Sequence, residues 1–262
     1  MTATIVYLYA VAAPPAAKWA AQGSVTGVEG ARVRAIDAAS LVALVSDVPE
    51  AMYDQPALDE HVRDGEWLNP RATTHQTVNA AAHAAIDAVL PVPFGTIYRT
   101  DDRVKEMLRE RADELQAKLA SVRGRSEWVI ALHRDASRAA EHLAQVREAV
   151  EPDAVASGTG RGYLEHRRGE LALREELRGF DAEAATAAQH AIERVSRVSF
   201  AEPVPEDGDV AARTTYVVRR TDEERMGHAV EGFNADWAER GYTLRATGPW
   251  PPYRSSGGEL AR

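Results

Sequence analysis

Histidine is the residue type in this chain with the widest chemical range, because it can bind a metal or transfer a proton near neutral pH. The eight histidines form no known metal motif such as HExxH. His75 and His83 would lie two turns apart on one side of a helix, too far to share a small ion without a third element. His133 and Asp135 suggest an acid–base pair, but they stand where a strand passes into a helix cap. We therefore expect no catalytic residue, no metal site and no cofactor.

A glycine-rich segment at residues 158–162 precedes a long helical pattern and invites comparison with a phosphate-binding loop. It lacks the Lys-Ser/Thr ending of a P-loop, and the residues before it make a poor strand, so a flexible helix entry is favoured. Arg161, Arg167 and Arg168 form a basic cluster with Tyr163 on the first turns of that helix. Two interpretations stay open, a solvated face paired with nearby glutamates and a contact site for an acidic partner.

Phe94, Gly95 and Thr96 lie within an apolar run at residues 92–98 that is predicted to be a strand. Glycine inside a strand usually marks a bulge or the close approach of another backbone. The strand could pack within its own domain or bind a partner. Both interpretations are compatible if the partner packs on the edge of the sheet.

Residues 247–253 read TGPWPPY and combine three prolines with two aromatic rings. Each proline fixes φ and lacks a backbone donor, so this segment is excluded from helices and central strands. It is predicted to be a stiff arm that holds Trp250, Pro251, Pro252 and Tyr253 at set positions. Either the rings dock on the chain's own core, or the arm is a preorganised binding element.

Composition narrows the function classes. The chain has 262 residues, of which 45% are hydrophobic, enough for one large or two ordinary domains. A formal charge of -9 disfavours a nucleic-acid partner. The absence of cysteine excludes disulfides and thiolate chemistry and suits a reducing compartment. No apolar run is long enough for a membrane span and no secretory signal is visible, so we expect a cytoplasmic protein.

Hydrophobic periodicity predicts the elements that position these residues. Predicted strands cover residues 5–11, 32–36, 41–45, 92–98, 127–133, 195–200, 214–219 and 242–246. Predicted helices surround Trp19, cover residues 58–89 with a break at Asn69-Pro70, and follow Thr100, Asp135, Gly160 and Thr221. The helix after Gly160 is either one long helix or two helices bent near Gly179.

This order predicts an α+β protein of two domains, each approximating a ferredoxin-like βαββαβ arrangement with extra helices. The predicted boundaries are residues 1–123 for the first domain and 124–246 for the second. Residues 247–262 form the proline-rich arm and a flexible tail.

Three motifs occur in a characteristic order: LPVPFGT at residues 90–96, GRGYL at 160–164 and TGPWPPY at 247–253. Together with VYLYA at residues 6–10, LVALVSDVP at 41–49 and the helix bearing Trp67, Arg71 and His75, they resemble the GvpF/GvpL family of gas vesicle proteins. The resemblance covers residues 5–253. Residues 157–160 and 254–258 depart from the family's usual helix entry and hydrophobic ending, so docking of the extreme tail stays open.

The resemblance implies two domains, the second with a modified ferredoxin-like fold. It also implies an accessory or minor structural protein of gas vesicle assembly, with no enzymatic activity. The implied partners are the hydrophobic shell protein of the GvpA type and other gas vesicle accessory proteins, and the implied locations are the cytoplasm and the gas vesicle. The alternative is a small-molecule-binding or hydrolytic enzyme with its site in the cleft between the domains.

Overall fold

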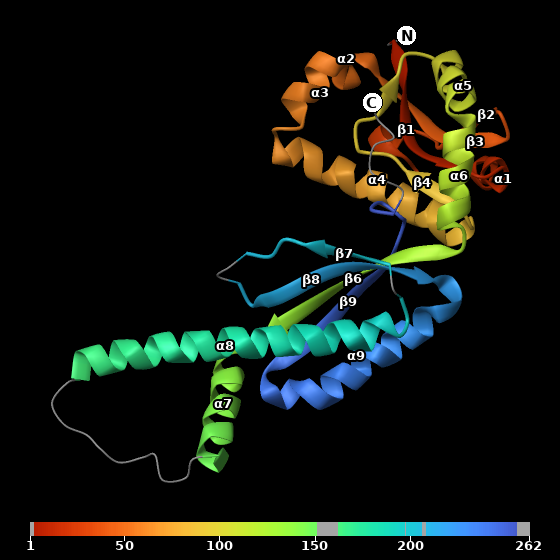
Figure 1. The fold of residues 1–262 in the computed structure, drawn as a ribbon. Helices are drawn as coiled ribbons and strands as arrows, with labels where there is room; N and C mark the ends of the chain where they lie inside the picture. The colour runs from red at the N-terminus through yellow and green to blue at the C-terminus, as the bar shows by residue number, and fades with distance from the viewer. Residues whose placement is uncertain (1–2, 151–161, 197, 206–207, 256–262) are drawn as a thin grey trace. The chain divides into compact units, whose positions relative to one another are not determined.

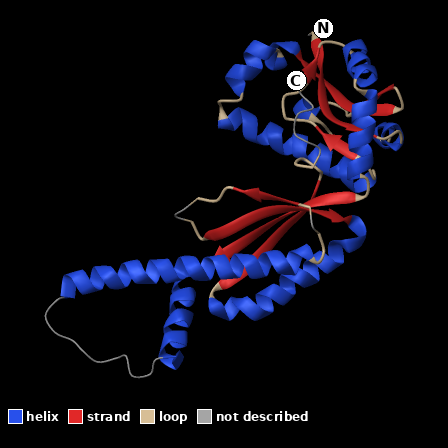
Figure 2. Cartoon of the chain, in the orientation of Figure 1, coloured by secondary structure: helices blue, strands red, loops and turns tan. Residues whose placement is uncertain are grey.

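A computed structural model describes residues 3–150, 162–196, 198–205 and 208–255, without the side chains of residues 148–150 and 162–174. Contacts divide the chain into two compact units. The first contains residues 1–127 and 249–262, and the second contains residues 128–248. Each unit is a mixed α+β structure built on its own sheet (Figures 1 and 2).

The first unit has a sheet of order β2-β3-β1-β4, with β5 also paired to β1. Its elements in chain order are β1 (Thr4–Ala12), α1 (Pro15–Ala21), the 3-10 turn η1 (Val28–Gly30), β2 (Arg34–Ala38), β3 (Leu41–Pro49), α2 (Glu50–Tyr53), α3 (Gln55–His61), α4 (Gly65–Ala85), β4 (Val89–Pro91), β5 (Ile97–Tyr98), α5 (Asp101–Glu110) and α6 (Ala112–Val122). Strand β1 pairs antiparallel with β3, β4 and β5.

Strand β1 is buried on both faces, which explains its continuous apolar sequence. Tyr7 and Tyr9 join a core with residues of α4, whereas Val6 and Leu8 join a second core with residues of α5 and α6. The register shifts between Leu8 and Ala10 where β1 pairs with β3. Because of this bulge, Tyr9 and its neighbour Ala10 belong to the same core. Helices therefore cover the first sheet on both sides.

The second sheet has the order β7-β8-β6-β9. The elements are β6 (Arg125–Arg134), α7 (Ala136–Val150), α8 (Gly162–Glu193), β7 (Ser199–Glu202), β8 (Val210–Arg219), η2 (Arg220–Asp222), α9 (Glu223–Trp237), η3 (Ala238–Arg240) and β9 (Tyr242–Trp250). Helices α8 and α9 lie side by side along one face of this sheet (Figure 1). Phe180, Ile192, Phe233 and Trp237 fill the core beneath them.

Two helix expectations are resolved by the structure. Helix α4 runs unbroken through Pro70, so the expected break at Asn69-Pro70 is wrong. Pro70 is the sixth residue of the helix, and a proline there removes only one bond, to a carbonyl of the first turn. The chain breaks instead just before Gly65, where the Asp64 side chain accepts from the Glu66 N–H at 2.9 Å. Of the two alternatives for the segment after Gly160, one long helix, α8, is observed.

Within the described residues, none of the helices combines the length and the apolar character required to cross a lipid bilayer.

Candidate partner-binding site

The edge strand of the first sheet is interrupted at the predicted site. Strands β4 and β5 both pair with β1, and the ladder bonds Val92 N–H to Tyr9 O (3.0 Å) and Leu8 N–H to Thr96 O (2.9 Å) flank the gap. The expectation of a continuous strand over residues 92–98 is therefore wrong. Residues 93–95 leave the ladder as a short loop, in which the backbone of Gly95 takes a left-handed conformation.

Gly95 is the residue that permits this loop. Its φ is 81°, in the left-handed region that disfavours other residues. A Cβ at this position would stand 2.9 Å from Leu58 Cδ2, so the Leu58 side chain of α3 would have to shift to admit another residue. Thr96 is buried, and its Oγ1 donates to the Pro93 carbonyl at 2.8 Å, which closes the loop. The expectation at Gly95 was a bulge or the close approach of another backbone, whereas the close neighbour in the structure is the side chain of Leu58.

Phe94 is half-buried at the tip of this loop and packs on an aromatic cluster. Its ring centroid lies 5.9 Å from Tyr7, 5.8 Å from His75 and 6.3 Å from Trp67, all in edge-on arrangements. Such pairs favour one orientation of each ring. The Phe94 side chain is therefore held in place by residues of β1 and α4.

A buried hydrogen-bond chain supports the loop from below. The Gly95 N–H donates to Tyr7 Oη at 3.2 Å, and Tyr7 Oη lies 2.9 Å from His75 Nδ1. His75 Nε2 lies 3.1 Å from the Val92 carbonyl, which can only accept, so Nε2 carries the ring proton and Nδ1 accepts from Tyr7. The Asn79 side-chain amide lies 3.0 Å from Nε2. Burial lowers the pKa of His75 to about 4, and burial also raises the pKa of Tyr7, so both rings are neutral at pH 7.

The C-terminal segment reaches this loop after β9. That strand lies at the edge of its sheet and continues through Trp250, which is 41% exposed, whereas Pro251 and Pro252 are buried. The Tyr253 N–H donates to the Pro251 carbonyl at 2.8 Å, which turns the chain. Tyr253 is half-buried beside Asn79, and burial raises the pKa of its hydroxyl. Of the two rings, only Tyr253 docks on the protein's own core.

A single carboxylate anchors this segment. Glu127 is 3% exposed and accepts from the Arg254 N–H at 3.1 Å, the Ser255 N–H at 2.6 Å and Ser255 Oγ at 2.9 Å. Hydrogen bonds to a charged group are the stronger kind. The tail therefore docks at residues 254 and 255, although its sequence differs from the ending usual in the family it resembles.

Phe94 and Tyr253 together form a pocket of about 300 Å³. Its wall comprises Ala72, His75 and Gln76 of α4, residues 91–94 and Tyr253. We call this the Phe94–Tyr253 pocket. Most of the wall is apolar, and its shape is set by a glycine turn, an aromatic cluster and an anchored tail. Such a pocket suits an apolar side chain of a partner.

The remaining predicted contact residues lie elsewhere or outside the described residues. Arg161 falls outside them, and the side chains of Tyr163, Arg167 and Arg168 on the first turns of α8 are not described. Trp250 is exposed and does not line the pocket. The structure therefore brings together residues 94 and 253, which stand far apart in the sequence.

The sequence assigned no site role to Tyr7, Asn79 or Glu127, and the only chemistry weighed for His75 was that of a metal ligand. His75 and His83 have separate partners, since His83 Nε2 lies 3.0 Å from Ser126 Oγ. Among the described residues, no three His, Asp or Glu side chains converge as a metal site. One signal was available: His75 and Asn79 stand one turn apart on the face of α4 that carries buried Val78 and Ala82. Polar residues on a buried face need partners.

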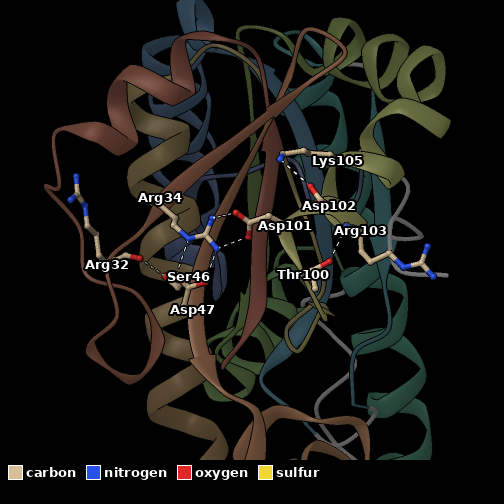
Figure 3. Close-up of polar contacts among 9 residues, drawn as sticks. All are labelled: Arg32, Arg34, Ser46, Asp47, Thr100, Asp101, Asp102, Arg103 and Lys105. Carbon is tan, nitrogen blue, oxygen red and sulfur yellow. Dashed lines mark hydrogen bonds and ion pairs between the residues drawn. The ribbon is translucent and has the colours of Figure 1, made fainter. Parts of the chain in front are cut away.

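A charge cluster elsewhere in the first unit is structural. Figure 3 shows the Arg34 guanidinium of β2 between the carboxylates of Asp47 and Asp101, which it contacts through four bonds of 2.6 to 3.0 Å. The hydrogen bonds that Arg34 donates, first to Asp47 and then to Asp101, raise the pKa of Arg34 further above its ordinary value. Thr100 caps α5 by accepting from the Arg103 N–H at 3.4 Å. The cluster ties α5 to β2 and β3, and its charges are satisfied internally.

We expect Arg34→Met to lower the free energy of unfolding by about 1–2 kcal/mol, because two carboxylates lose a shared bidentate partner and repel each other. The partial exposure of the three side chains keeps the effect at this modest size. Urea unfolding measures it. Arg103→Met is the matched control, since Arg103 is exposed and pairs with exposed Glu106 one turn away. Equal losses in the two variants would contradict the role given to Arg34.

Comparison with known proteins agrees with this architecture. The family model described as "Gas vesicle synthesis protein GvpL/GvpF" matches residues 5–254. Gas vesicle protein L of Streptomyces sp. (strain CB03234) is 27% identical over 241 residues, which cover 88% of this chain and 85% of the relative. Gas vesicle protein L2 of Halobacterium salinarum is 25% identical over 260 residues, which cover 94% of this chain and 89% of that relative. The crystal structure of GvpF from Anabaena sp. PCC7120 shares the fold, with a TM-score of 0.70 at 16% identity over 97% of this chain and 96% of that one. The chain belongs to the GvpL/GvpF family of gas vesicle synthesis proteins.

Proposed function

We propose that this protein acts in gas vesicle assembly as a carrier that binds the hydrophobic, GvpA-type shell subunit until the subunit is incorporated. The family description and the names of the relatives support a role in gas vesicle synthesis. A subunit that has not yet been incorporated exposes apolar surface and unpaired strand edges, and such species aggregate. A carrier that covers this surface prevents the shell subunit from aggregating. The role needs no catalytic residue and no cofactor.

The observation that carries the proposal is the Phe94–Tyr253 pocket. It is an apolar hollow of about 300 Å³ whose walls are fixed before any partner arrives. A preformed pocket loses little side-chain entropy when it takes up an apolar anchor. The interrupted edge at residues 93–95 lies beside it, so a strand edge of the shell subunit could pack against β5 while one of its side chains enters the pocket. Phe94, Gly95, Thr96, Pro251, Pro252 and Tyr253 are the contact residues we propose here.

We propose two further contact elements, each taken by itself. Trp250 is an exposed aromatic residue, the kind that often anchors protein interfaces. Arg161, Tyr163, Arg167 and Arg168 form a basic and aromatic cluster in the sequence that suits an acidic stretch of the shell subunit or of another gas vesicle accessory protein. We place the carrier in the cytoplasm, with the gas vesicle as the destination of its cargo.

We also propose a ferredoxin-like arrangement for both units. Counted within each unit, the four main strands have the spatial order 2-3-1-4, which is the order of a split βαβ sheet. In the first unit all pairs between these strands are antiparallel, as that arrangement requires. We further propose a domain boundary near residue 124, just before β6, and an arm from residue 247 whose first four residues still belong to β9.

A variant at the pocket mouth tests the carrier role. Gln76 is exposed and lines the pocket, so Gln76→Lys places a charge at the mouth without removing a core residue. We expect protection of the shell subunit against sedimentation to need about tenfold more of this variant, equivalent to about 1.4 kcal/mol of binding free energy. The measurement mixes purified shell subunit with increasing amounts of each protein and follows the pelleted fraction.

Thr77→Lys is the matched control, because Thr77 is the next exposed residue of α4 and does not line the pocket. Equal protection by both variants would remove the pocket from the mechanism. A shell subunit that pellets equally with and without the unaltered protein would remove the carrier role itself.

A further inference from the structure

A groove in the second unit runs between α8 and α9 and shares no residue with the Phe94–Tyr253 pocket. Its volume is about 630 Å³. The floor is made of small residues, Ala187 and Ala191 from α8 and Ala229 and Gly232 from α9. Gly232 is exposed, and a Cβ added there would meet no atom within 4 Å. We call this the α8/α9 groove.

The floor allows another backbone to come close. Helices pack with their axes about 8–10 Å apart, and small side chains permit the lower end of this range. Phe233 and Trp237 lie beneath the floor, and their stacked rings, with centroids 5.6 Å apart, make it rigid. A helix α9 of 15 residues offers a track of about 22 Å, enough for about four turns of a partner helix.

The rim of the groove is basic although the chain as a whole carries a formal charge of -9. His190 and Arg194 stand one turn apart on α8, Arg225 and His228 stand on α9, and all four are exposed. Arg225 is held by Asp222 at 2.9 Å and by the Arg194 carbonyl at 3.4 Å. Among the described residues, no carboxylate pairs with the side chains of His190, Arg194 or His228. Asp236 is the one acidic residue in the wall described here.

We propose that the α8/α9 groove binds an acidic amphipathic helix of a partner protein. The helix lays its small apolar residues on the floor, and its Asp and Glu side chains pair with Arg194 and Arg225 at the rim. Charge complementarity selects this occupant, because a basic rim on an acidic molecule attracts an acidic segment and repels basic ones. The floor of small residues favours a packed helix over separate anions that bind at the rim alone. The groove is a second interaction surface, independent of the shell-binding role.

The test uses a synthetic helical peptide with an alanine face flanked by glutamates, labelled with a fluorophore, and the full-length protein. We expect binding by fluorescence anisotropy that weakens at least about tenfold in Arg194→Glu, through charge reversal, and in Gly232→Leu, through filling of the floor. The same peptide with glutamine in place of glutamate is expected to bind about tenfold more weakly than the acidic one. Binding of the acidic peptide should also weaken as salt is raised.

Two variants match these changes outside the groove. Arg178→Glu reverses an exposed arginine of the same helix α8, and Gly179→Leu adds a side chain at an exposed helical glycine with open space around it. Both are expected to bind the peptide like the unaltered protein, and circular dichroism confirms that all four variants fold. Binding that falls in Arg194→Glu but persists in Gly232→Leu would show mere anion attraction and overturn the proposal. Absence of binding by the unaltered protein at low salt would overturn it as well.

Discussion

Replacing Glu127 with alanine is expected to release the C-terminal segment and to speed cleavage by trypsin after Arg254 about 100-fold. Three hydrogen bonds end on this one buried carboxylate, two from backbone N–H groups and one from Ser255 Oγ. Each bond to a charged group contributes about 1.5–3 kcal/mol, so even a partial loss lowers the free energy of local opening by about 3 kcal/mol. That energy corresponds to an increase of about 100-fold in the population of the open segment. Mass spectrometry of the peptide released after Arg254 measures the rate.

A graded series makes this expectation sharper. Glu127→Gln keeps one carbonyl acceptor, so its cleavage rate should fall between those of the unaltered protein and Glu127→Ala. Glu110→Ala removes an exposed glutamate of α5 and should leave the rate unchanged. Cleavage at one rate in all four proteins would show that the carboxylate does not hold the tail.

The same variant links the tail to the pocket. Tyr253 forms one wall of the Phe94–Tyr253 pocket and directly precedes the two anchored residues. A released segment carries this wall away, so Glu127→Ala should also weaken protection of the shell subunit. The effect arises without any change to Phe94, which keeps its contacts with Tyr7 and His75.

Local chemistry predicted most of the elements. The strand over residues 5–11, the cap at Thr100 and the stop at Gly241 all appear where their residue types require them. Gly241 has a φ of 87°, the left-handed conformation typical of a residue that ends a helix. These features depend on neighbours within a few positions, which is the range over which a sequence pattern can be read directly.

The errors arose where a local rule met a tertiary or positional exception. Proline usually breaks a helix, but at Pro70 it stands early enough in α4 that one lost bond in the first turns is tolerated. The apolar run over residues 92–98 has strand composition, but Gly95 turns the backbone so that Phe94 can reach Tyr7 and Trp67. The packing of Phe94 in the aromatic cluster outweighed the tendency of residues 92–98 to form a continuous strand.

The candidate site could be predicted only in pieces. Residues 94 and 253 were each singled out, but no periodic pattern says that they share one pocket. Glu127 was predicted only as the first residue of a strand over residues 127–133, while its hydrogen-bond partners stand 127 and 128 positions later in the chain. A resemblance to a family can place motifs in order, whereas their convergence is a property of the folded chain.

His75 is expected to make stability fall as the solution is acidified. Burial lowers the pKa of His75 to about 4 in the folded protein, against about 6.5 in an unfolded chain. Between these values the unfolded state binds more protons, so this contribution is fully present above pH 6.5 and is lost as pH falls towards 4. A difference of about 2.5 pKa units corresponds to about 3 kcal/mol. Protonation at Nδ1 also removes the acceptor for Tyr7, whose hydroxyl receives the Gly95 N–H that supports the Phe94 loop.

The variant His75→Gln isolates this contribution because glutamine does not titrate in that range. We expect the free energy of urea unfolding of the unaltered protein to exceed that of the variant at pH 7.5, and the gap to shrink by about 3 kcal/mol on going to pH 4. His190→Gln makes the same substitution at an exposed histidine of α8 and serves as the matched control. A gap for His75→Gln that is constant from pH 7.5 to pH 4 would mean that His75 is not held neutral beneath the loop. The support assigned to the Phe94–Tyr253 pocket would then have to come from the aromatic packing alone.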